Sequence, residues 1–409
     1  MRVAVVGGGL AGLSAALQLV DEGHEVTLQE ARPTLGGAVQ TLPRREGDPE
    51  PPPDNGQHIA LGCFTEYQRF LERIGEGGSL RRVPLELPVI DERGRAATIA
   101  RSPLALVRYR HVPLRDRLGI LRLLAGGGGP WAASSFADYL RTQGQSQQAL
   151  DRFWDVFMRP ALNLRSEEAS AEAGLFTLHT ALLSGRKASR LLLPMRPLSE
   201  MHGEAAARAL ERAGATVQAG SKVESLAELD ADGVVVAVPP GESARLLGEP
   251  EPKLDHSPIV SVHLLFDRPI LRTPMAALLD SPAHWVFDRG RLTGREPERG
   301  QYLTVVSSGA PELEALRGRE LVELMAGSVT ERLGEAELRW SRVSREPAAT
   351  IAVRPGSEAE RRRPETAHAN VVRAGAWTAT GWPPTMEGAV RSGLAAVRAL
   401  TTAPAKVAA

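Results

Sequence analysis

The sequence predicts an α/β protein in which a domain built on a parallel sheet is interrupted by an inserted α+β domain. Three observations support this fold class. Residues 2–29 read as strand, glycine-rich turn, helix and strand, residues 371–400 read as strand, loop and helix, and the chain between them mixes helical and strand patterns. A length of 409 residues is sufficient for two or three compact units, and the hydrophobic fraction of 43% is that of a globular protein.

The N-terminal segment predicts a βαβ unit of the Rossmann-like type. Residues 2–6 form a short apolar strand, residues 10–21 form a helix that ends near Gly23, and residues 24–29 form a second strand. In such a unit the turn between the first strand and the helix lies at the carboxyl edge of the sheet, where nucleotides bind.

This turn carries a glycine motif, GxGxxG, formed by Gly7, Gly9 and Gly12, and Leu10 and Ala11 open the helix. The first glycine permits the turn, the second lets a diphosphate approach the backbone, and the third lets helix and strand pack closely. The N-terminus of the helix then receives the diphosphate charge. We therefore predict that these residues bind a dinucleotide.

An acidic residue, Glu30, ends the second strand eighteen positions after Gly12. A carboxylate at this place accepts hydrogen bonds from a ribose 2′-hydroxyl and repels a 2′-phosphate. The spacing therefore favours FAD or NAD over NADP.

The residues after Glu30 resemble a known flavoprotein signature. They run Ala31, Arg32, Pro33, Thr34, Leu35, Gly36 and Gly37. The segment is similar to the extended dinucleotide signature of the flavin amine oxidase and phytoene desaturase superfamily, in which the paired glycines let the loop run close to the cofactor. The resemblance implies FAD as the cofactor and a GR2-type flavoprotein fold. One departure is Ala38, because the superfamily usually has an arginine after the glycine pair.

A second strand, loop and helix start lie near the C-terminus. Residues 371–374 read as a strand, and after the loop a helix runs to about Leu400. The N–H groups at such a helix start can face an electron-rich ring or a diphosphate. The segment resembles the superfamily's C-terminal flavin motif. The resemblance implies cofactor contacts for Gly375, Ala376, Thr385, Met386 and Ala389.

In that motif, the residues matching Gly375 and Ala376 lie beside the diphosphate and the ribityl chain, and the amide matching Met386 faces the flavin pyrimidine. Ala376 is a second departure, because the superfamily usually has an aspartate there. The loss of one hydrogen bond weakens cofactor binding by about 1 kcal/mol without abolishing it.

Two segments in the middle of the chain return to the nucleotide domain. Residues 213–225 read as a helix end and a short strand, and residues 232–238 as a strand that closes at a proline pair. In the superfamily, the residue matching Val223 contacts adenine through its backbone. The alternative for Val223 is an ordinary buried valine.

The predicted domain organisation is discontinuous. Residues 1–80, 191–250 and 365–405 form the FAD-binding domain, and residues 81–190 and 251–364 form a substrate domain with a helical part and a sheet part. Within the substrate domain, residues 103–190 are mainly helical, strands are expected at 259–267, 285–287, 302–307 and 338–343, and a helix at 320–333. The charged segment 44–50 is expected to be a solvent-exposed loop.

The most distinctive internal segment runs Asp54-Asn55-Gly56-Gln57-His58, followed by Leu61-Gly62-Cys63. It resembles the hydroxysqualene dehydroxylases, squalene-associated flavoenzymes of hopanoid biosynthesis. Further resemblance is found at residues 163–170, 285–288 and 377–389, so it extends over nearly the whole chain. The resemblance implies reductive removal of an allylic hydroxyl from a C30 isoprenoid to give squalene.

This reaction needs a proton donor, because the hydroxyl leaves as water, and a dry cavity in which reduced flavin delivers hydride to the allylic cation. His58 and Asp54 are the catalytic candidates for the donor. The alternative for this pair is a hydrogen-bond network in a loop beside the cofactor. Cys63 is expected to be a small apolar residue rather than a nucleophile, because no activating partner is evident. The nine histidines show no metal-ligand spacing, so no metal site is predicted.

Two other functions remain open. A phytoene-type desaturase would use the same dinucleotide motifs in the oxidative direction, and a flavin-binding carrier without turnover would explain Ala38 and Ala376 as marks of a decayed site. An amine oxidase is disfavoured, because those sites often use an aromatic cage and a lysine, and only 4% of this chain is aromatic. No motif identifies the reductant that recharges the flavin.

Charge and hydropathy restrict the partners. The 49 basic and 49 acidic residues cancel, so there is no global basic field for nucleic acid. No signal peptide is evident, and residues 118–133 contain an arginine, a proline and four consecutive glycines, which exclude a spanning helix. We expect a cytoplasmic protein, peripheral to the inner face of the cell membrane.

The expected membrane-surface contact is residues 102–131, because five arginines and one aspartate alternate there with apolar residues. The apolar residues are Leu104, Leu106, Leu118, Ile120, Leu121, Leu123, Leu124 and Trp131. The alternative is an amphipathic core helix with a solvated arginine face.

Overall fold

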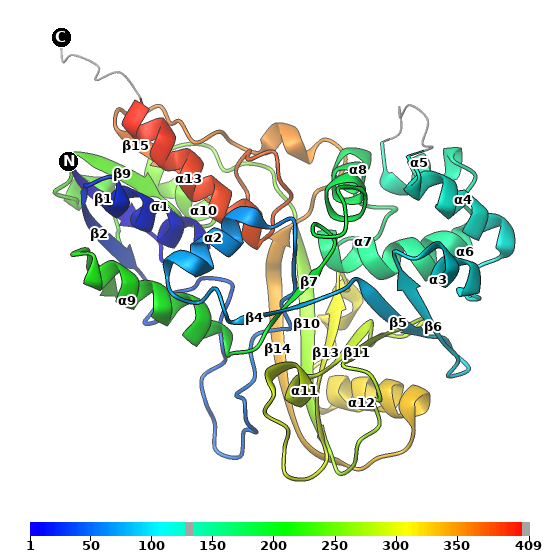
Figure 1. Ribbon diagram of the computed structural model, residues 1–409. Helices are drawn as coiled ribbons and strands as arrows, with labels where there is room; N and C mark the ends of the chain where they lie inside the picture. Colours follow the sequence, from blue (N-terminus) through cyan, green and yellow to red (C-terminus); the bar gives the residue numbers. More distant parts are fainter. Residues whose placement is uncertain (127–133, 403–409) are drawn as a thin grey trace.

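The computed structural model describes residues 1–126 and 134–402, and its first layer is a five-stranded parallel sheet (Figure 1). The strand order is β15-β9-β1-β2-β8. The strands are β1 (Arg2–Val6), β2 (Glu25–Glu30), β8 (Thr216–Ala219), β9 (Gly233–Val236) and β15 (Val371–Arg373). Three distant parts of the sequence therefore share one sheet, as expected for a Rossmann-like domain.

The central strand of this sheet is β1, and it is apolar because both faces of the sheet are covered. Val5 pairs with Leu28 of β2 on one side and with Val235 of β9 on the other, and all three side chains are fully buried. The covering helices are α1 (Leu10–Asp21), α9 (Ala205–Arg212), α10 (Pro240–Leu247), α13 (Met386–Thr402) and, beyond α13, α2 (Thr65–Arg73).

The two ends of the chain meet where α13 packs along α1, seen as the red and dark-blue helices of Figure 1. Gly393 allows the two helices to approach closely, because a Cβ at this position would lie only 2.2 Å from the carbonyl oxygen of Ala11. Ser14 adds a hydrogen bond to the Val390 carbonyl at 3.1 Å. This packing fixes the N-terminus of α13 relative to that of α1.

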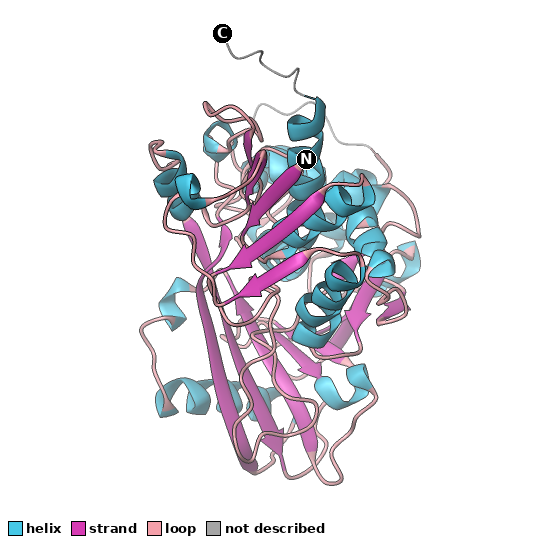
Figure 2. Ribbon diagram, turned by 90° about the vertical axis from the view of Figure 1, so that its left-hand side faces the viewer, coloured by secondary structure: helices cyan, strands magenta, loops and turns pink. Residues whose placement is uncertain are grey.

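The second layer is a seven-stranded sheet with the order β14-β10-β13-β12-β11-β5-β6. Figure 2 shows its long strands extending away from the parallel sheet. The strands are β5 (Glu86–Ile90), β6 (Ala96–Ala100), β10 (His256–Phe266), β11 (Met275–Leu278), β12 (Trp285–Asp288), β13 (Gln301–Ser308) and β14 (Leu338–Ile351). Helix α12 (Arg319–Leu333) buries Leu321, Met325 and Val329 against this sheet, and α11 (Arg289–Thr293) follows β12.

The helical part packs on the other side of the seven-stranded sheet (Figure 1). Its elements are α3 (Pro103–Arg108), α4 (Leu114–Leu124), α5 (Phe136–Thr142), α6 (Gln147–Ala149), α7 (Asp155–Leu162), α8 (Ala171–Thr177) and the π-helical turns η1 (Leu150–Trp154) and η2 (Leu178–Leu183). Its core centres on Trp154, whose ring meets Phe136 and Phe153 edge to face. Strands β3 (Ala60–Leu61), β4 (Leu80–Val83) and β7 (Leu191–Pro194) connect this part to the parallel sheet.

Several elements differ from those expected. Strands β4 to β6 were not anticipated, and β14 extends to Ile351 rather than ending near Val343. The longer β14 is an edge strand, where Pro347 costs no ladder hydrogen bond. The domain bounds assigned from the sequence stay a prediction.

Segment 44–50 is not fully solvent-exposed, which corrects the sequence interpretation. The Asp48 carboxylate is only 2% exposed and forms an ion pair with Arg342 of β14. Arg342 also donates to the Pro43 carbonyl at 2.7 Å. A charge in this loop is thus buried because a distant strand supplies its counterion.

The expected apolar contact surface at residues 102–131 is also corrected in part. Leu106, Ile120 and Leu123 are buried in the core of the helical part, whereas Leu104 and Leu118 are exposed. Trp131 lies outside the described residues. Among the described residues, no helix has both the length and the apolar character needed to span a bilayer.

Candidate cofactor and substrate site

The glycine loop after β1 has the geometry that its motif predicts. Gly7 has a φ of +107°, and a Cβ there would lie 2.3 Å from the Ala237 carbonyl oxygen. A Cβ on Gly12 would lie 1.9 Å from the Gly7 carbonyl oxygen. Around Gly9 the nearest atom to such a Cβ is 3.7 Å away. Gly7 and Gly12 are therefore required for packing, and the backbone at Gly9 is left approachable.

Helix α1 begins directly after Gly9, with Leu10 and Ala11 in its first turn. No side chain caps this N-terminus. Its first N–H groups and the helix dipole are therefore available to an anion. A diphosphate fits this place both in charge and in hydrogen-bonding capacity.

Glu30, at the carboxyl end of β2, lies against the glycine loop. Its carboxylate accepts hydrogen bonds from the backbone N–H of Gly8 at 2.6 Å and of Arg32 at 2.8 Å. Ala31 and Arg32 are exposed beside it. The carboxylate is thus held beside the glycine loop at the end of β2, which is where dinucleotide-binding sheets place the acid that binds a ribose.

The paired glycines of the second loop contact the first loop. The Gly36 N–H donates to the Gly8 carbonyl at 2.8 Å, and a Cβ on Gly37 would lie 2.8 Å from the Cα of Gly9. Both have positive φ, +115° and +62°. Only glycine lets these two loops approach so closely.

Val223 lies in the segment after β8, beside the carboxyl end of β2. Ser221 donates its N–H to the Glu30 carbonyl at 2.8 Å, and Arg245 donates to the Val223 carbonyl at 3.3 Å. The Val223 side chain is buried against Val234 and Leu247. Its backbone therefore lies near the carboxyl end of β2, and its side chain belongs to the core.

The C-terminal loop is held by three residues that sequence reasoning did not identify. Arg361, which is 6% exposed, donates to the carbonyls of Ala376 at 3.1 Å and Thr378 at 2.7 Å. Trp377 donates from its indole to the Val238 carbonyl at 3.0 Å. The hydroxyl of Ser392 accepts from the Gly375 N–H at 2.9 Å. An isolated arginine and serine carry no sequence signal for such roles.

Thr385 directly precedes α13, whose first residues, Met386 to Ala389, lie next to α2. The Thr385 hydroxyl accepts from the Gly388 N–H at 3.2 Å, whereas Met386 and Ala389 are partly exposed. Between them, the buried Glu387 accepts from the Tyr67 N–H of α2 at 2.8 Å. It also accepts from the N–H of Glu66 at 3.2 Å and from Arg391 at 2.7 Å. Glu387 thus ties the start of α13 to the start of α2.

An aromatic cluster joins this start of α13 to the helical part. The partly exposed Trp382 lies 6.0 Å from Phe64 and 5.1 Å from Phe176 of α8 between ring centroids. The guanidinium of Arg391 lies 4.6 Å from the centre of its ring. Aromatic side chains from the segment before α2, from α8 and from the segment before α13 therefore meet beside the candidate flavin segment.

Asp54 is a buried anchor in the structure. Its carboxylate accepts from the Thr41 hydroxyl at 2.6 Å and the Leu198 N–H at 3.0 Å, and pairs with Arg289 at 2.7 Å. Its carbonyl contacts His263 Nε2 at 2.9 Å. With Asp54 and Arg289 both less than 5% exposed, these contacts favour the network role for Asp54 over proton donation.

Unlike Asp54, His58 is not fully buried. Its Nδ1 lies 3.3 Å from the Gly56 carbonyl oxygen, and its side chain remains partly accessible. The surrounding protein lowers the pKa of His58. Behind it, Tyr67 and His202 share a fully buried hydrogen bond of 2.8 Å. His58 is therefore neutral at neutral pH.

Cys63 behaves as an apolar residue. Burial raises the pKa of the Cys63 thiol to about 11, so the thiolate is scarce at neutral pH. Its side chain packs against the core beside α1. Over residues 1–126 and 134–402, no cluster of three or more His, Cys, Asp or Glu side chains has the arrangement of a metal site.

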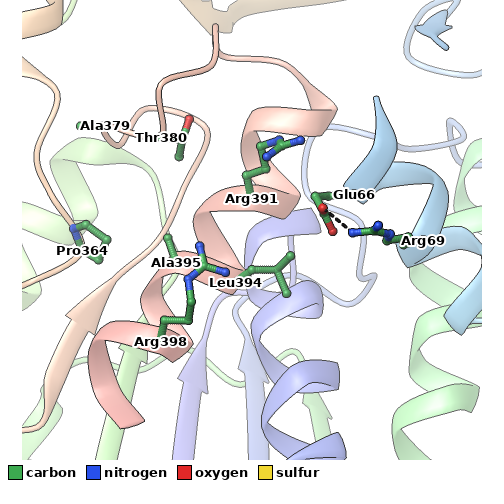
Figure 3. A pocket seen from close by; sticks show the side chains of 9 residues that line it. All are labelled: Glu66, Arg69, Pro364, Ala379, Thr380, Arg391, Leu394, Ala395 and Arg398. Atoms are coloured by element: carbon green, nitrogen blue, oxygen red, sulfur yellow. Dashed lines mark hydrogen bonds and ion pairs between the residues drawn. The ribbon is translucent and has the colours of Figure 1, made fainter. Parts of the chain in front are cut away.

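A polar cavity of about 400 Å³ lies on the outer side of α13 (Figure 3). Arg69, Arg391 and Arg398 line it, and Arg69 pairs with Glu66 at 2.7 Å. This lining does not suit a C30 hydrocarbon. The dry cavity expected for the substrate stays a prediction.

Together, the fold and the glycine, acid and helix-start elements define a dinucleotide-binding flavoprotein. The family model for flavin containing amine oxidoreductases matches residues 10–401. The chain belongs to this family and is an FAD-dependent oxidoreductase, so the sequence prediction of FAD is confirmed.

Relatives and solved structures agree with this assignment. Hydroxysqualene dehydroxylases of Sinorhizobium fredii and Rhodopseudomonas palustris are 30% and 28% identical to this chain, each over 96% of both chains. A probable zeta-carotene desaturase of Synechococcus elongatus is 25% identical over 99% of both. An oxidoreductase from Methanosarcina mazei has the same fold, with a TM-score of 0.74 and 17% identity over 96% of this chain and 99% of that chain. The predicted fold class is thereby confirmed.

Proposed function

We propose that the protein converts hydroxysqualene to squalene by reductive removal of the allylic hydroxyl, as a step of hopanoid formation. The observation that carries this proposal is the 30% identity to the Sinorhizobium fredii hydroxysqualene dehydroxylase over 96% of both chains. In the balanced reaction, the C–O bond breaks, the hydroxyl takes one proton and leaves as water, and one hydride forms the new C–H bond.

The cofactor would be held by both ends of the chain. Gly9 and the start of α1 would face its diphosphate, Glu30 its ribose, and Met386 its pyrimidine ring. When bound and reduced, FAD supplies the hydride. The remaining tasks, which are proton supply and exclusion of water, belong to the chain's own side chains.

His58 is the proposed proton donor. With Nδ1 directed to the Gly56 carbonyl, Nε2 is the ring atom that binds and releases the proton. Asp54 has a positioning role in this proposal, because it holds the 54–58 loop to Leu198 and Arg289. The aromatic cluster of Phe64, Phe176 and Trp382 contributes apolar surface near the flavin segment.

The test is anaerobic incubation of the FAD-loaded, dithionite-reduced protein with hydroxysqualene. Formation of squalene together with reoxidation of the flavin supports the proposal. Unchanged hydroxysqualene with flavin that stays reduced contradicts it. Flavin that binds but supports no turnover of hydroxysqualene, phytoene or zeta-carotene would instead support the flavin-binding carrier.

A carotenoid desaturase is the second candidate, because the similarity to the Synechococcus elongatus protein spans 99% of both chains. The oxidised protein is therefore incubated in parallel with phytoene and with zeta-carotene. New conjugated double bonds, seen as longer-wavelength absorption, would favour this candidate over dehydroxylation.

A further inference from the structure

Large apolar side chains are exposed on two neighbouring helices of the substrate domain. The described residues include six exposed large apolar side chains, and four of them lie on α3 and α4. These four are Leu104 at 54%, Val107 at 46%, Leu114 at 56% and Leu118 at 57% exposure. The concentration of such side chains in one place is unusual, because single exposed apolar residues are normally scattered.

The four side chains lie on two helices that contact each other. Leu104 and Val107 are three residues apart on α3, and Leu114 and Leu118 are four apart on α4, so each pair shares a helix face. Arg117 of α4 donates to the Val107 carbonyl at the end of α3, which holds the helices side by side. The opposite face of α4 is already used by the core, through Ile120 and Leu123.

The same helices carry an unbalanced positive charge. Residues 101–122 contain the arginines Arg101, Arg108, Arg110, Arg115, Arg117 and Arg122. None of them forms an ion pair with a carboxylate in the part of the chain that the structure describes. The one acidic residue, Asp116, is 2% exposed and accepts two hydrogen bonds from Ser146. The exposed charge of these helices is therefore entirely positive.

We propose that this α3–α4 surface, made of Leu104, Val107, Leu114, Leu118 and the surrounding arginines, docks on an anionic lipid bilayer. The apolar side chains would enter the boundary between headgroups and acyl chains while the arginines bind lipid phosphates. A second copy of the chain fits less well, because two such surfaces would bring like charges together.

The purpose of the docking rests on the proposed function, since a C30 isoprenoid is nearly insoluble and has to be taken from a membrane. The docking itself does not, because it depends only on the surface and can be measured without substrate. The two ideas can therefore fail separately.

The test is flotation of the FAD-loaded protein with vesicles of phosphatidylglycerol and phosphatidylcholine in equal parts, and with phosphatidylcholine alone. We expect flotation with the anionic vesicles at low salt and its loss at high salt. Leu114→Asn combined with Leu118→Asn should reduce the partition coefficient at least ~10-fold. Arg110→Gln combined with Arg115→Gln should reduce it on the order of 20-fold.

Matched controls come from other helices. Leu324→Asn removes an apolar side chain that is 37% exposed on α12, and Arg208→Gln removes an exposed arginine of α9. Both should float like the unchanged protein. Thermal melting of every variant verifies that it is folded.

Three outcomes would overturn the proposal: no flotation with anionic vesicles at low salt, equal flotation of the Leu114/Leu118 variant, or a dimer in sedimentation that this variant abolishes. Turnover of detergent-dispersed hydroxysqualene separates the two ideas. A leucine variant that turns over normally but does not float supports docking, whereas a protein that floats but never forms squalene contradicts only the proposed function.

Discussion

Ala376 is the residue at which this chain departs from the flavin motif inside an otherwise well-held loop. Its carbonyl is bonded to Arg361, and its side chain is partly exposed. We predict that Ala376→Asp tightens FAD binding about fivefold, because the carboxylate accepts a hydrogen bond worth about 1 kcal/mol from a ribityl hydroxyl. The dissociation constant, measured by titrating apoprotein with FAD, checks this.

The control for this change is Ala379→Asp, which places the same charge three residues further along the loop, in the wall of the polar cavity. It should leave FAD affinity unchanged. If Ala376→Asp bound FAD as tightly as the unchanged protein, or more weakly, the idea that Ala376 leaves a hydrogen-bonding position vacant would be contradicted.

Substitutions of His58 test whether this side chain is the proton donor. Removing a general acid costs typically about 10² to 10⁴-fold in rate, so His58→Ala should lower kcat by this amount while bound flavin, measured by absorbance, stays constant. His58→Gln should be equally slow. Unchanged turnover would eliminate His58 as the required donor.

The same residue predicts a pH dependence of turnover. Burial lowers the pKa of His58, so the protonated donor is a minor species at neutral pH and grows as the pH falls. The turnover of the unchanged protein should therefore rise on mild acidification, and the residual turnover of His58→Ala should not. A pH–rate profile of both proteins with flavin content measured at each pH is the check.

Among the elements, the contact of α1 with α13 is the one that unites the two ends of the chain. A Cβ at position 393 would lie 2.2 Å from the Ala11 carbonyl oxygen and 2.9 Å from the Ala15 nitrogen. Gly393→Ala should therefore lower the free energy of unfolding by roughly 1–3 kcal/mol and loosen FAD binding, because it separates the helices. Urea denaturation and FAD titration measure these two effects.

Gly327→Ala is the matched control, since Gly327 lies in α12 with no atom within 4 Å of the added Cβ. There the substitution should be neutral or stabilising by up to about 1 kcal/mol, because alanine favours helix. Equal destabilisation by both substitutions would show that helix contact is not the cause.

The link between α2 and α13 depends on Glu387. Its two carboxylate oxygens accept hydrogen bonds from two backbone N–H groups and from Arg391. In Glu387→Gln, one of these oxygens becomes an NH₂ group that faces another donor at a buried position, so hydrogen bonds are lost. We expect a loss of about 1–3 kcal/mol in unfolding free energy. Glu323→Gln, which breaks the exposed pair with Arg319, should cost no more than about 1 kcal/mol. Guanidinium denaturation of both variants measures these two losses of unfolding free energy.

At the scale of the whole molecule, buried neutral histidines make stability depend on pH. Burial lowers the pKa of His202 to about 4 and those of His263 and His284 to about 3, from 6.5 for an exposed imidazole. Between these values the unfolded chain binds more protons than the folded protein. The contribution of these histidines to the free energy of unfolding is therefore fully present above about pH 6.5 and is lost as the pH falls toward 4.

For His202 alone, the loss at pH 5 should be on the order of 2 kcal/mol. Urea denaturation near neutral pH and near pH 5 measures it, and His202→Gln should remove that part of the pH dependence. His256→Gln, at an exposed position, should not. A stability that does not change over this range would contradict neutral burial of these histidines.

The local elements of both chain ends could be predicted from the sequence. The helix expected at residues 10–21 is α1 with the same bounds, because its start is fixed by the glycine loop and its end lies beside Gly23. The positive φ of Gly7, Gly36 and Gly37 likewise follows from short-range geometry that only glycine adopts readily. Signals of this kind are contained in a few consecutive residues.

What the tertiary structure decided is which distant groups meet. The pairing of Asp54 with Arg289, of Asp48 with Arg342 and of Glu387 with the start of α2 joins positions more than 200 residues apart. It also decided that α4 buries Ile120 and exposes Leu118, although both are apolar residues of one helix. Periodicity and motif spacing report the conformation of a segment, whereas burial and ion pairing depend on what packs against it, and that is determined only when the whole chain has folded.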